Sequence, residues 1–219
     1  MTHLPLLEFL ESYLTENRKN RFKEVLSQRT KHFTVAVEDV YQLHNTSAVI
    51  RSCDVFGIQD VHIIEEVNVK KIDREIAMGA QKWVDVHRYH TTKDCVNRLK
   101  ARGYQIVATS PHAEDSNLND FDVLKPSCFF FGRETEGLSD TVLDNADIQI
   151  KIPMVGFTES LNISVATAII LQDLTTRLRN SQVNWALTAE EKDMLRFDWC
   201  KKSINNVDRI IERYYSDKS

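Results

Sequence analysis

The segment IPMVGFTESLNISVATA, residues 152–168, decides the interpretation of this 219-residue chain. A strand-like run over residues 147–154 is interrupted by a proline and a glycine, and a helical segment rich in small and β-branched residues then opens at Ser160. A buried helix gains nothing from polar Ser160, Asn162 and Ser164 unless these groups find partners. The three therefore indicate polar groups aimed at a bound ligand, although a helix simply capped at Ser160 would carry the same pattern.

Before this segment, short apolar runs alternate with helical patterns. The strand-like runs are residues 33–40, 60–66, 83–90, 104–110, 127–132 and 147–154. The helical patterns between them are residues 46–56, 91–102 and 139–145. Such alternation predicts an α/β fold, with a mainly parallel sheet covered by helices on both faces.

Helical signals also occupy both ends of the chain. Residues 4–29 form one of them, and residues 187–215 form the other, which begins with the capping-box pattern Thr188-Ala189-Glu190-Glu191. We therefore expect three parts: a basic helical extension over residues 1–31, the α/β domain over residues 32–180, and a helical extension over residues 181–219.

The composition is that of an ordinary globular chain, with 42% hydrophobic and 27% charged residues. The four cysteines form no CxxC pair, so we expect reduced thiols, no disulfide framework and no structural metal. The N-terminus lacks a basic region followed by an apolar run, and no segment approaches about 18 apolar residues. These features predict a cytoplasmic protein that does not enter a membrane.

The net charge of −4 conceals a basic segment. Residues 17–32 contain six lysines and arginines and a single acid, Glu24. On a helix, Arg18, Arg21 and Arg29 would lie within about 80° of arc. A solvated helix face would explain this pattern, but basic clusters also supply electrostatic affinity for nucleic acid whatever the overall charge.

Two further segments place polar groups beside expected strand ends. HNTSAVIR, residues 44–51, follows the first strand, and ligands of parallel sheets bind beyond the carboxyl ends of strands. An N-cap asparagine and a surface arginine would look the same. GRETEGLS, residues 132–139, carries two glycines that would let backbone amides approach a ligand closely. It is neither a dinucleotide fingerprint nor a P-loop, and a plain strand–turn–helix remains possible.

Taken together and in this order, the three segments resemble the SPOUT superfamily of methyltransferases, specifically the TrmH-type tRNA guanosine-2′-O-methyltransferases. The family's first motif, Asn followed by Arg six residues later, is matched by Asn45 and Arg51. Its second motif, Gly-x-Glu-x-x-Gly-Leu-Ser, is matched by residues 132–139, and its third, IPM-x-G…SLN-x-S-x-A, by residues 152–166. The resemblance covers almost the whole chain.

The resemblance implies an α/β domain whose C-terminal part forms a deep trefoil knot, an exception to the rule that proteins are unknotted. It implies that S-adenosylmethionine binds in the knot, held largely by backbone groups, so that added bulk at Gly132 or Gly156 should exclude it. It further implies a homodimer with active sites near the subunit interface, and tRNA as substrate, at the ribose of guanosine 18 in the D-loop.

The resemblance also implies roles for individual residues. The expected catalytic residues are Asn45, Arg51, Glu134, Ser160 and Asn162. The expected cofactor-binding residues are Gly132, Glu134, Gly137, Ile152, Met154, Ser160 and Leu161. We expect tRNA to contact Arg18, Arg21, Arg29, His44, Arg177 and Arg179. The last two depart from the family, which carries a tight arginine cluster after the third motif.

The chemistry of the residues agrees with these roles. Methylating a ribose hydroxyl requires removing its proton and aligning its oxygen with a sulfonium methyl group. Asn45, Ser160 and Asn162 can orient the ribose and Arg51, and Glu134 can fix Asn45 or its own loop. Because a guanidinium keeps its proton in nearly all protein settings, we expect Arg51 to stabilise the developing alkoxide rather than to act as a base.

Other functions remain open at this point. Ribosomal RNA or another tRNA position could be methylated by the same chemistry, although ribosomal members commonly carry a separate N-terminal RNA-binding domain. A non-catalytic RNA-binding relative would not need the whole set of expected catalytic residues. A nucleotide-dependent enzyme would suit the strand–helix alternation, but it would require a glycine fingerprint after the first strand.

Overall fold

The structure is a computed structural model that describes residues 4–66, 79–114, 116–133 and 135–217. The chain divides into two compact units. Thr30–Trp185 forms an α/β unit, and Met1–Arg29 together with Ala186–Ser219 forms a helical unit.

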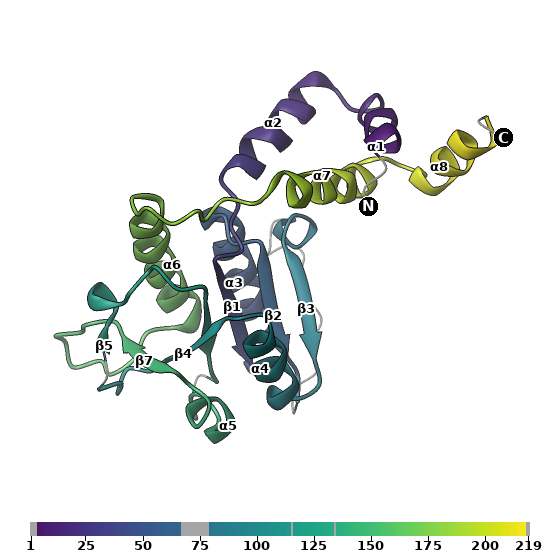
Figure 1. Cartoon of the computed structure of the whole chain (residues 1–219). Helices are drawn as coiled ribbons and strands as arrows, with labels where there is room; N and C mark the ends of the chain where they lie inside the picture. The colour runs from purple at the N-terminus through teal and green to yellow at the C-terminus, as the bar shows by residue number, and fades with distance from the viewer. Residues whose placement is uncertain (1–3, 67–78, 115, 134, 218–219) are drawn as a thin grey trace. The chain divides into compact units, whose positions relative to one another are not determined.

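The α/β unit is built on a seven-stranded sheet in the order β3-β2-β1-β6-β4-β7-β5, and its paired strands run parallel throughout (Figure 1). The strands are β1 (Phe33–Glu38), β2 (Asp60–Ile64), β3 (Asp85–Tyr89), β4 (Gln105–Thr109), β5 (Ser116–Asn117), β6 (Ser127–Phe131) and β7 (Ile148–Lys151). The predicted mainly parallel sheet is confirmed. The sequence analysis missed β5, which has too few residues to show a periodicity.

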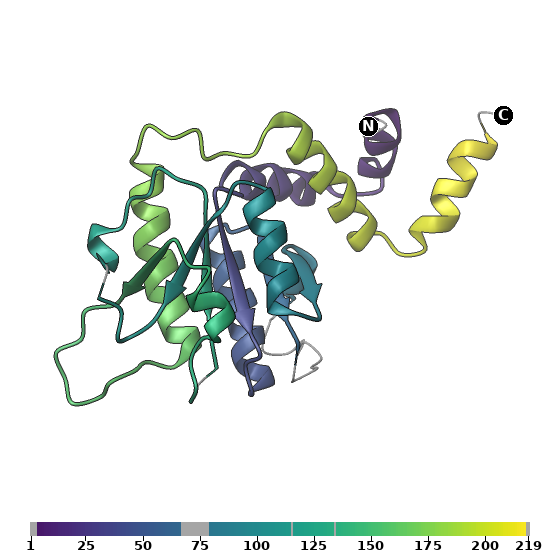
Figure 2. The ribbon, with the colours of Figure 1, turned by 60° about the horizontal axis from the view of Figure 1, so that its bottom comes forward.

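Four helices accompany the sheet: α3 (Leu43–Phe56), α4 (Thr92–Ala101), α5 (Asp140–Leu143) and α6 (Ile163–Arg179). Alternation along the strands divides the core into two layers. In β6, Phe129 and Phe131 pack in the cluster that contains side chains of α3 and α6, whereas Cys128 and Phe130 pack in the cluster that contains side chains of α4 and α5. Figure 2 shows these helices on the two faces of the sheet, as predicted.

The helical unit contains α1 (Leu4–Glu11), α2 (Glu16–Ser27), α7 (Ala189–Ser203) and α8 (Val207–Ser216). The expected capping box begins α7: the Thr188 side chain accepts from the Glu191 amide, and Glu191 accepts from the Thr188 amide. Arg196 of α7 donates two hydrogen bonds, at 2.6 and 3.0 Å, to Oε1 of Glu11. Trp199 is fully buried and packs edge-on against Phe22.

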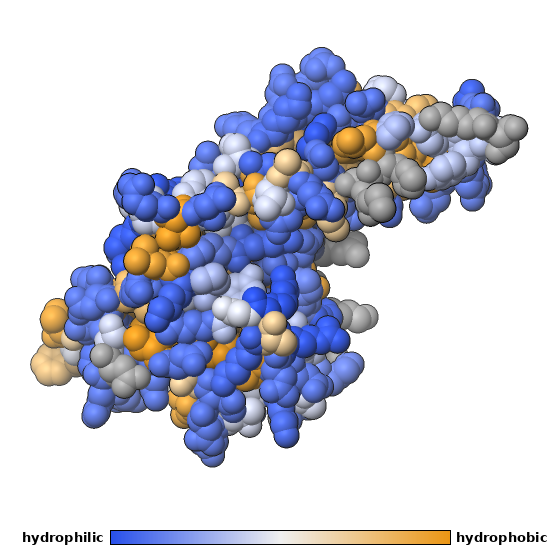
Figure 3. All heavy atoms as spheres, viewed as in Figure 1, coloured by the Kyte–Doolittle hydropathy of each residue, from blue (hydrophilic) through white to orange (hydrophobic). Residues whose placement is uncertain are grey.

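The surface is mostly polar. On the face drawn in Figure 3, hydrophilic residues predominate and apolar residues form separate patches. The most exposed large apolar side chains of the α/β unit are Val55, Leu124, Val155 and Phe157. Among the described helices, none is both long enough and apolar enough to cross a lipid bilayer.

Candidate active site

A cavity of about 670 Å³ opens at the carboxyl-terminal edge of the sheet. It is lined by residues of segments that follow four strands: Gln42 and Asn45 after β1; Ser110, Pro111 and His112 after β4; Gly132, Arg133, Thr135, Glu136, Gly137 and Leu138 after β6; and Ile152, Met154, Glu159, Ser160, Leu161, Asn162 and Ile163 after β7. The strand order reverses beside β1 and β6, and ligands of open α/β sheets bind at such a reversal. The volume suits a small-molecule site.

Asn45 and Asn162 meet at this edge although they are far apart in the sequence. Asn162 Nδ2 donates to Asn45 Oδ1 at 3.2 Å, and Asn45 is buried in the first turn of α3. Asn162 is the N-cap of α6, because its Oδ1 accepts from the backbone amide of Ser164 at 2.8 Å. The predicted opening of this helix at Ser160 is therefore too early. The structure joins the first and third sequence segments through two amides.

Gly132 lies where only glycine fits. An added Cβ would lie 2.3 Å from the backbone carbonyl of Gly137, which itself has a φ of +73°. Two backbone hydrogen bonds between Arg133 and Gly137, of 2.9 and 3.1 Å, close the turn between the glycines. Gly156 differs, because an added Cβ there would meet only the amide of Thr158 at 4.0 Å. A side chain at Gly132 would therefore disturb the loop that lines the cavity, whereas one at Gly156, which does not line the cavity, would not. Exclusion of the cofactor by added bulk at either position stays a prediction.

The remaining expected cofactor residues that the structure describes also lie at the cavity. Ile152, Met154 and Leu161 line it with apolar atoms, and exposed Ser160 lines it with a hydroxyl. Glu134, expected in both the catalytic and the cofactor-binding sets, lies outside the described residues.

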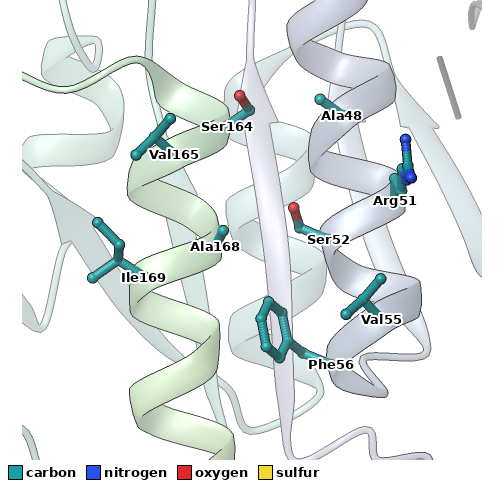
Figure 4. A pocket seen from close by; sticks show the side chains of 9 residues that line it. All are labelled: Ala48, Arg51, Ser52, Val55, Phe56, Ser164, Val165, Ala168 and Ile169. Carbon is teal, nitrogen blue, oxygen red and sulfur yellow. The ribbon is translucent and has the colours of Figure 1, made fainter.

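Arg51 lies apart from this cavity. It lines a second hollow of about 450 Å³ between α3 and α6, which we call the α3/α6 groove. The groove is lined by Ala48, Arg51, Ser52, Val55, Phe56, Ser164, Val165, Ala168 and Ile169. In Figure 4, Ser52 and Ala48 lie between the helices, whereas the exposed Arg51 side chain lies on the side of α3 away from α6. The structure thus brings Asn45 and Asn162 together without bringing Arg51 to them.

The two arginines after the third segment are engaged within the α/β unit. Arg177 forms an ion pair of 2.6 Å with Asp173, and it also donates to the carbonyls of Leu118 and Phe121. Arg179 donates to the carbonyl of Phe56 at 2.9 Å. In this conformation both guanidinium groups are committed to the fold, whereas His44 is exposed at the start of α3.

The basic segment also divides into exposed and buried members. Arg18 and Arg21 are exposed on α2, and Arg21 forms an ion pair with Glu24 at 2.8 Å. Arg29 is only 1% exposed, with its guanidinium 5.7 Å from the centre of the Trp199 ring. The prediction that the three arginines share one helical arc is wrong for Arg29, because α2 ends at Ser27 and Arg29 follows its C-cap, where it is buried.

Several cavity residues were not selected from the sequence. Ser110, Pro111 and His112 follow β4, and Lys151 ends β7. Pro111 and His112 directly follow the predicted run of residues 104–110, which was a signal that could have identified them, whereas Ser110 and Lys151 fall inside the predicted runs of residues 104–110 and 147–154. Gln42 was also missed; it stands three residues before Asn45 and accepts a hydrogen bond of 3.4 Å from it.

Comparison with known proteins places this geometry in a family. Residues 32–172 match the model of the SpoU rRNA Methylase family. A Borreliella burgdorferi protein named tRNA (guanosine(18)-2′-O)-methyltransferase is 39% identical over 201 residues, which are 92% of each chain. The A. aeolicus TrmH/SpoU tRNA modifying enzyme has a structure similar to this one, with a TM-score of 0.78 and 34% identity over 86% of this chain and 98% of that one.

A second similar structure was solved with a ligand. It is the AdoMet-bound rRNA methyltransferase from Sinorhizobium meliloti, with a TM-score of 0.59 and 25% identity over 72% of this chain and 60% of that chain.

The chain therefore belongs to the SpoU methylase family. Within that family, the Borreliella burgdorferi and A. aeolicus proteins to which it is similar carry names that refer to tRNA.

Proposed function

We propose that the chain transfers a methyl group from S-adenosylmethionine to a ribose 2′-OH of tRNA, at guanosine 18. The observation that carries the proposal is the meeting of Asn45 and Asn162 beside the glycine-bearing cavity. The 39% identity to a relative named for guanosine 18 extends over nearly the whole of both chains and supports tRNA as the substrate.

The cavity suits S-adenosylmethionine. Gly132 allows the backbone of Gly137 to approach it closely and so shapes the loop beside the cavity, and Ile152, Met154 and Leu161 line the cavity and would offer apolar side chains to a nucleoside. When bound, S-adenosylmethionine supplies the transferred methyl group on a sulfonium centre. The AdoMet-bound relative, which is 25% identical, supports the same choice of cofactor.

The residues at the cavity would orient the acceptor ribose. Ser160 carries a hydroxyl, and the amide pair of Asn45 and Asn162 is already fixed by its own hydrogen bond. Arg51 would stabilise the negative charge that develops on the 2′-oxygen, while the proton leaves to water or to a phosphate oxygen. Glu134 would fix Asn45 or its own loop.

This role for Arg51 requires a second copy of the chain. Arg51 lies on the α3/α6 groove, not on the cavity of its own chain. Val55 is 68% exposed there, and Val165 and Ile169 are 46% and 39% exposed, so the groove presents apolar area that a partner would cover. We infer a homodimer in which each copy covers this groove and brings Arg51 to the partner's cavity.

For tRNA binding we propose direct phosphate contacts by the exposed side chains Arg18, Arg21 and His44. Arg29, Arg177 and Arg179 would contribute only if their present contacts were released. We therefore assign Arg29 a supporting role, in which it holds α2 against Trp199 within the helical unit.

Three further features complete the proposal. We propose that the segment after β7 and α6 form a deep trefoil knot, and the TM-score of 0.78 to the A. aeolicus enzyme supports a family-like course of the chain. We retain the division at residues 1–31, 32–180 and 181–219 into a basic extension, a methyltransferase domain and a C-terminal extension. The four free, buried cysteines suit a cytoplasmic setting, where tRNA is found.

One experiment tests the proposed reaction. The purified chain is incubated with methyl-labelled S-adenosylmethionine and a tRNA transcript, and with a matched transcript that carries 2′-deoxyguanosine at position 18. We expect label on the first transcript, located at guanosine 18 by nucleoside mapping, and none on the second. Equal labelling of both would disprove the assigned position. Labelling of ribosomal RNA alone would instead indicate a ribosomal substrate.

A further inference from the structure

Glu38, at the carboxyl end of β1, is a buried carboxylate with a full set of partners. It is 1% exposed. Its Oε1 accepts from Thr92 Oγ1 at 2.5 Å and from Ser139 Oγ at 2.6 Å, and its Oε2 accepts from the Ser139 amide at 2.9 Å. Ser139 is the N-cap of α5 and ends the loop that begins at Gly132. Glu38 therefore fixes one end of that loop to the sheet.

The next residues reach the middle of the same loop. Asp39 is buried, and its Oδ2 lies 3.4 Å from Nη2 of Arg133. The hydroxyl of Tyr41 donates to Glu136 Oε1 at 2.9 Å, and this hydrogen bond raises the pKa of Tyr41. Asp39 has a φ of +46°, a backbone conformation that costs free energy for a residue other than glycine. With this strained backbone conformation at Asp39, the side chains of Glu38, Asp39 and Tyr41 all contact the loop that follows Gly132.

The loop held in this way is the one that lines the candidate cofactor cavity. Gly132, Thr135 and Glu136 all line it. The residues that hold the loop also lead directly into α3, in which Asn45 lies. Glu38, Asp39 and Tyr41 are therefore joined to the loop through their side chains and to α3 through the chain itself.

We propose that Glu38, Asp39 and Tyr41, which we call the clasp, are positioning residues that hold the loop of residues 132–139 in its cofactor-binding shape and couple cofactor binding to tRNA binding. The inference rests on the proposed function. Neither the sequence motifs nor the expected site residues include any member of the clasp. Because binding of two ligands is reciprocally linked, a clasp that joins the cofactor loop to α3 should make each ligand bind more tightly when the other is present.

The test uses Tyr41→Phe, which removes one exposed hydroxyl and leaves the ring in place. The matched control is Tyr104→Phe, because the Tyr104 hydroxyl donates a hydrogen bond of 2.6 Å to the carbonyl of Lys31, away from the cavity. S-adenosylhomocysteine, which carries no transferable methyl group, is titrated into each variant with and without tRNA. Calorimetry gives both affinities and therefore their coupling.

We expect Tyr41→Phe to weaken S-adenosylhomocysteine binding about 3- to 10-fold and to reduce the enhancement by tRNA, since a hydrogen bond of this kind contributes a factor of that size. Its KM for S-adenosylmethionine should rise while kcat at saturation changes little. Tyr104→Phe should match wild type in all of these quantities. Glu38→Gln should have a larger effect, about 10- to 100-fold, because it removes a charged acceptor.

Two outcomes would overturn the inference separately from the proposed function. If wild type binds S-adenosylhomocysteine and Tyr41→Phe binds it with unchanged affinity and coupling, the clasp is disproved and the methyltransferase assignment stands. If Tyr41→Phe lowers kcat with unchanged affinity, Tyr41 acts in the reaction and not on the loop. If wild type binds no S-adenosylhomocysteine, the proposed function and the clasp both fail.

Discussion

The candidate cofactor cavity and the α3/α6 groove lie on the same unit and both include residues of α3 and α6, yet their side chains differ in how far they are paired or buried. At the cavity, Asn45 pairs with Asn162, and the loop after Gly132 is held at both ends. At the groove, Val55, Val165 and Ile169 are exposed, and the Arg51 side chain makes no hydrogen bond or ion pair with the described residues.

This difference distinguishes the site whose contacts form within one chain from the surface whose apolar residues stay uncovered in one chain. Around the cavity, the hydrogen bond between Asn45 and Asn162 and the contacts of the loop after Gly132 form within one chain, and such preorganisation lowers the cost of binding. The groove offers apolar area, and the Arg51 side chain there forms no ion pair with the described residues. Under the proposed function, the cofactor would bind a site formed by one chain, whereas the role proposed for Arg51 would depend on a second copy.

The largest effect is expected at the cavity. Gly132→Val would place side-chain atoms in the backbone of Gly137, because even a Cβ there lies 2.3 Å from it. We expect no detectable binding of S-adenosylmethionine by calorimetry, with a normal circular dichroism spectrum. Gly156→Val is the matched control and should bind normally, since that position is open. Loss of binding in both variants would mean that the glycine loop is not the specific determinant.

Next in size is the effect of Arg51→Lys, which sharpens the distinction between cavity and groove. The charge is retained but the planar fork is lost, so kcat should fall by about 10²- to 10³-fold. The affinity for S-adenosylmethionine should remain close to that of wild type, because Arg51 does not line the cavity. A pH–rate profile that falls in height without changing shape supports electrostatic stabilisation. An ionisation that vanishes in the variant would instead identify Arg51 as a base.

Measuring the free energy of unfolding against pH tests whether a loss of stability in acid arises at the cavity, at the groove or inside the sheet. His62 is fully buried in β2, and its burial lowers the pKa of the ring from 6.5 to about 3. Between these values the unfolded chain binds a proton that the folded chain does not, so stability must fall as the pH decreases from 6.5. We expect a loss of about 2 to 3 kcal/mol between pH 6.5 and 4.5, measured by urea unfolding.

The variant His62→Gln should flatten this dependence, whereas His90→Gln, at an exposed histidine, should preserve it. An unchanged slope in His62→Gln would contradict the assignment to His62.

The groove is tested by Val165→Glu, which places a charge in the apolar surface between the helices. If two copies meet there, the dissociation constant of the dimer should rise more than tenfold, as measured by sedimentation, because a buried unpaired carboxylate is strongly unfavourable. Binding of S-adenosylmethionine should persist. Leu124→Glu provides the control, since Leu124 is 59% exposed and does not line the groove. A dimer that tolerates Val165→Glu would exclude this interface.

The smallest effect concerns the helical unit and the two kinds of arginine on it. Arg21→Ala should weaken tRNA binding a few-fold and reduce the salt slope of binding by close to one unit per lost phosphate contact. Arg29→Ala should leave that slope unchanged and lower the melting temperature instead, because Arg29 is buried against Trp199. A flattened slope for Arg29→Ala would show that its guanidinium does reach tRNA.

The centre of the sheet was predictable because β1, β2 and β6 are buried along their whole length. Runs such as Phe129-Phe130-Phe131 carry this signature in the sequence, and each predicted run contains a strand of the structure. β5 was not predictable, since two residues carry no period.

The candidate site was predictable as a set of segments, but its contacts were not. Spacing places Asn45 at a helix start, yet nothing local indicates that it meets Asn162, because that contact depends on how α6 returns to α3. Glu38 and Asp39 offered a usable signal, two acids at the end of an apolar strand, which indicates a carboxylate with buried partners. The burial of Arg29 was not predictable from its own segment, because the Trp199 ring that lies against it comes from the other end of the chain.

The two ends of the planar Asn162 side-chain amide make two different hydrogen bonds. Its oxygen completes the first turn of α6, and its nitrogen reaches Asn45. An aspartate has two equivalent oxygens, so it would cap the helix equally well, but it would place a carboxylate oxygen against Oδ1 of Asn45. The preference for an N-cap residue therefore does not distinguish aspartate from asparagine, although only asparagine carries the amide nitrogen that donates to Asn45. A protein engineer who reused this scaffold for another acceptor would have to exchange both asparagines as a matched couple.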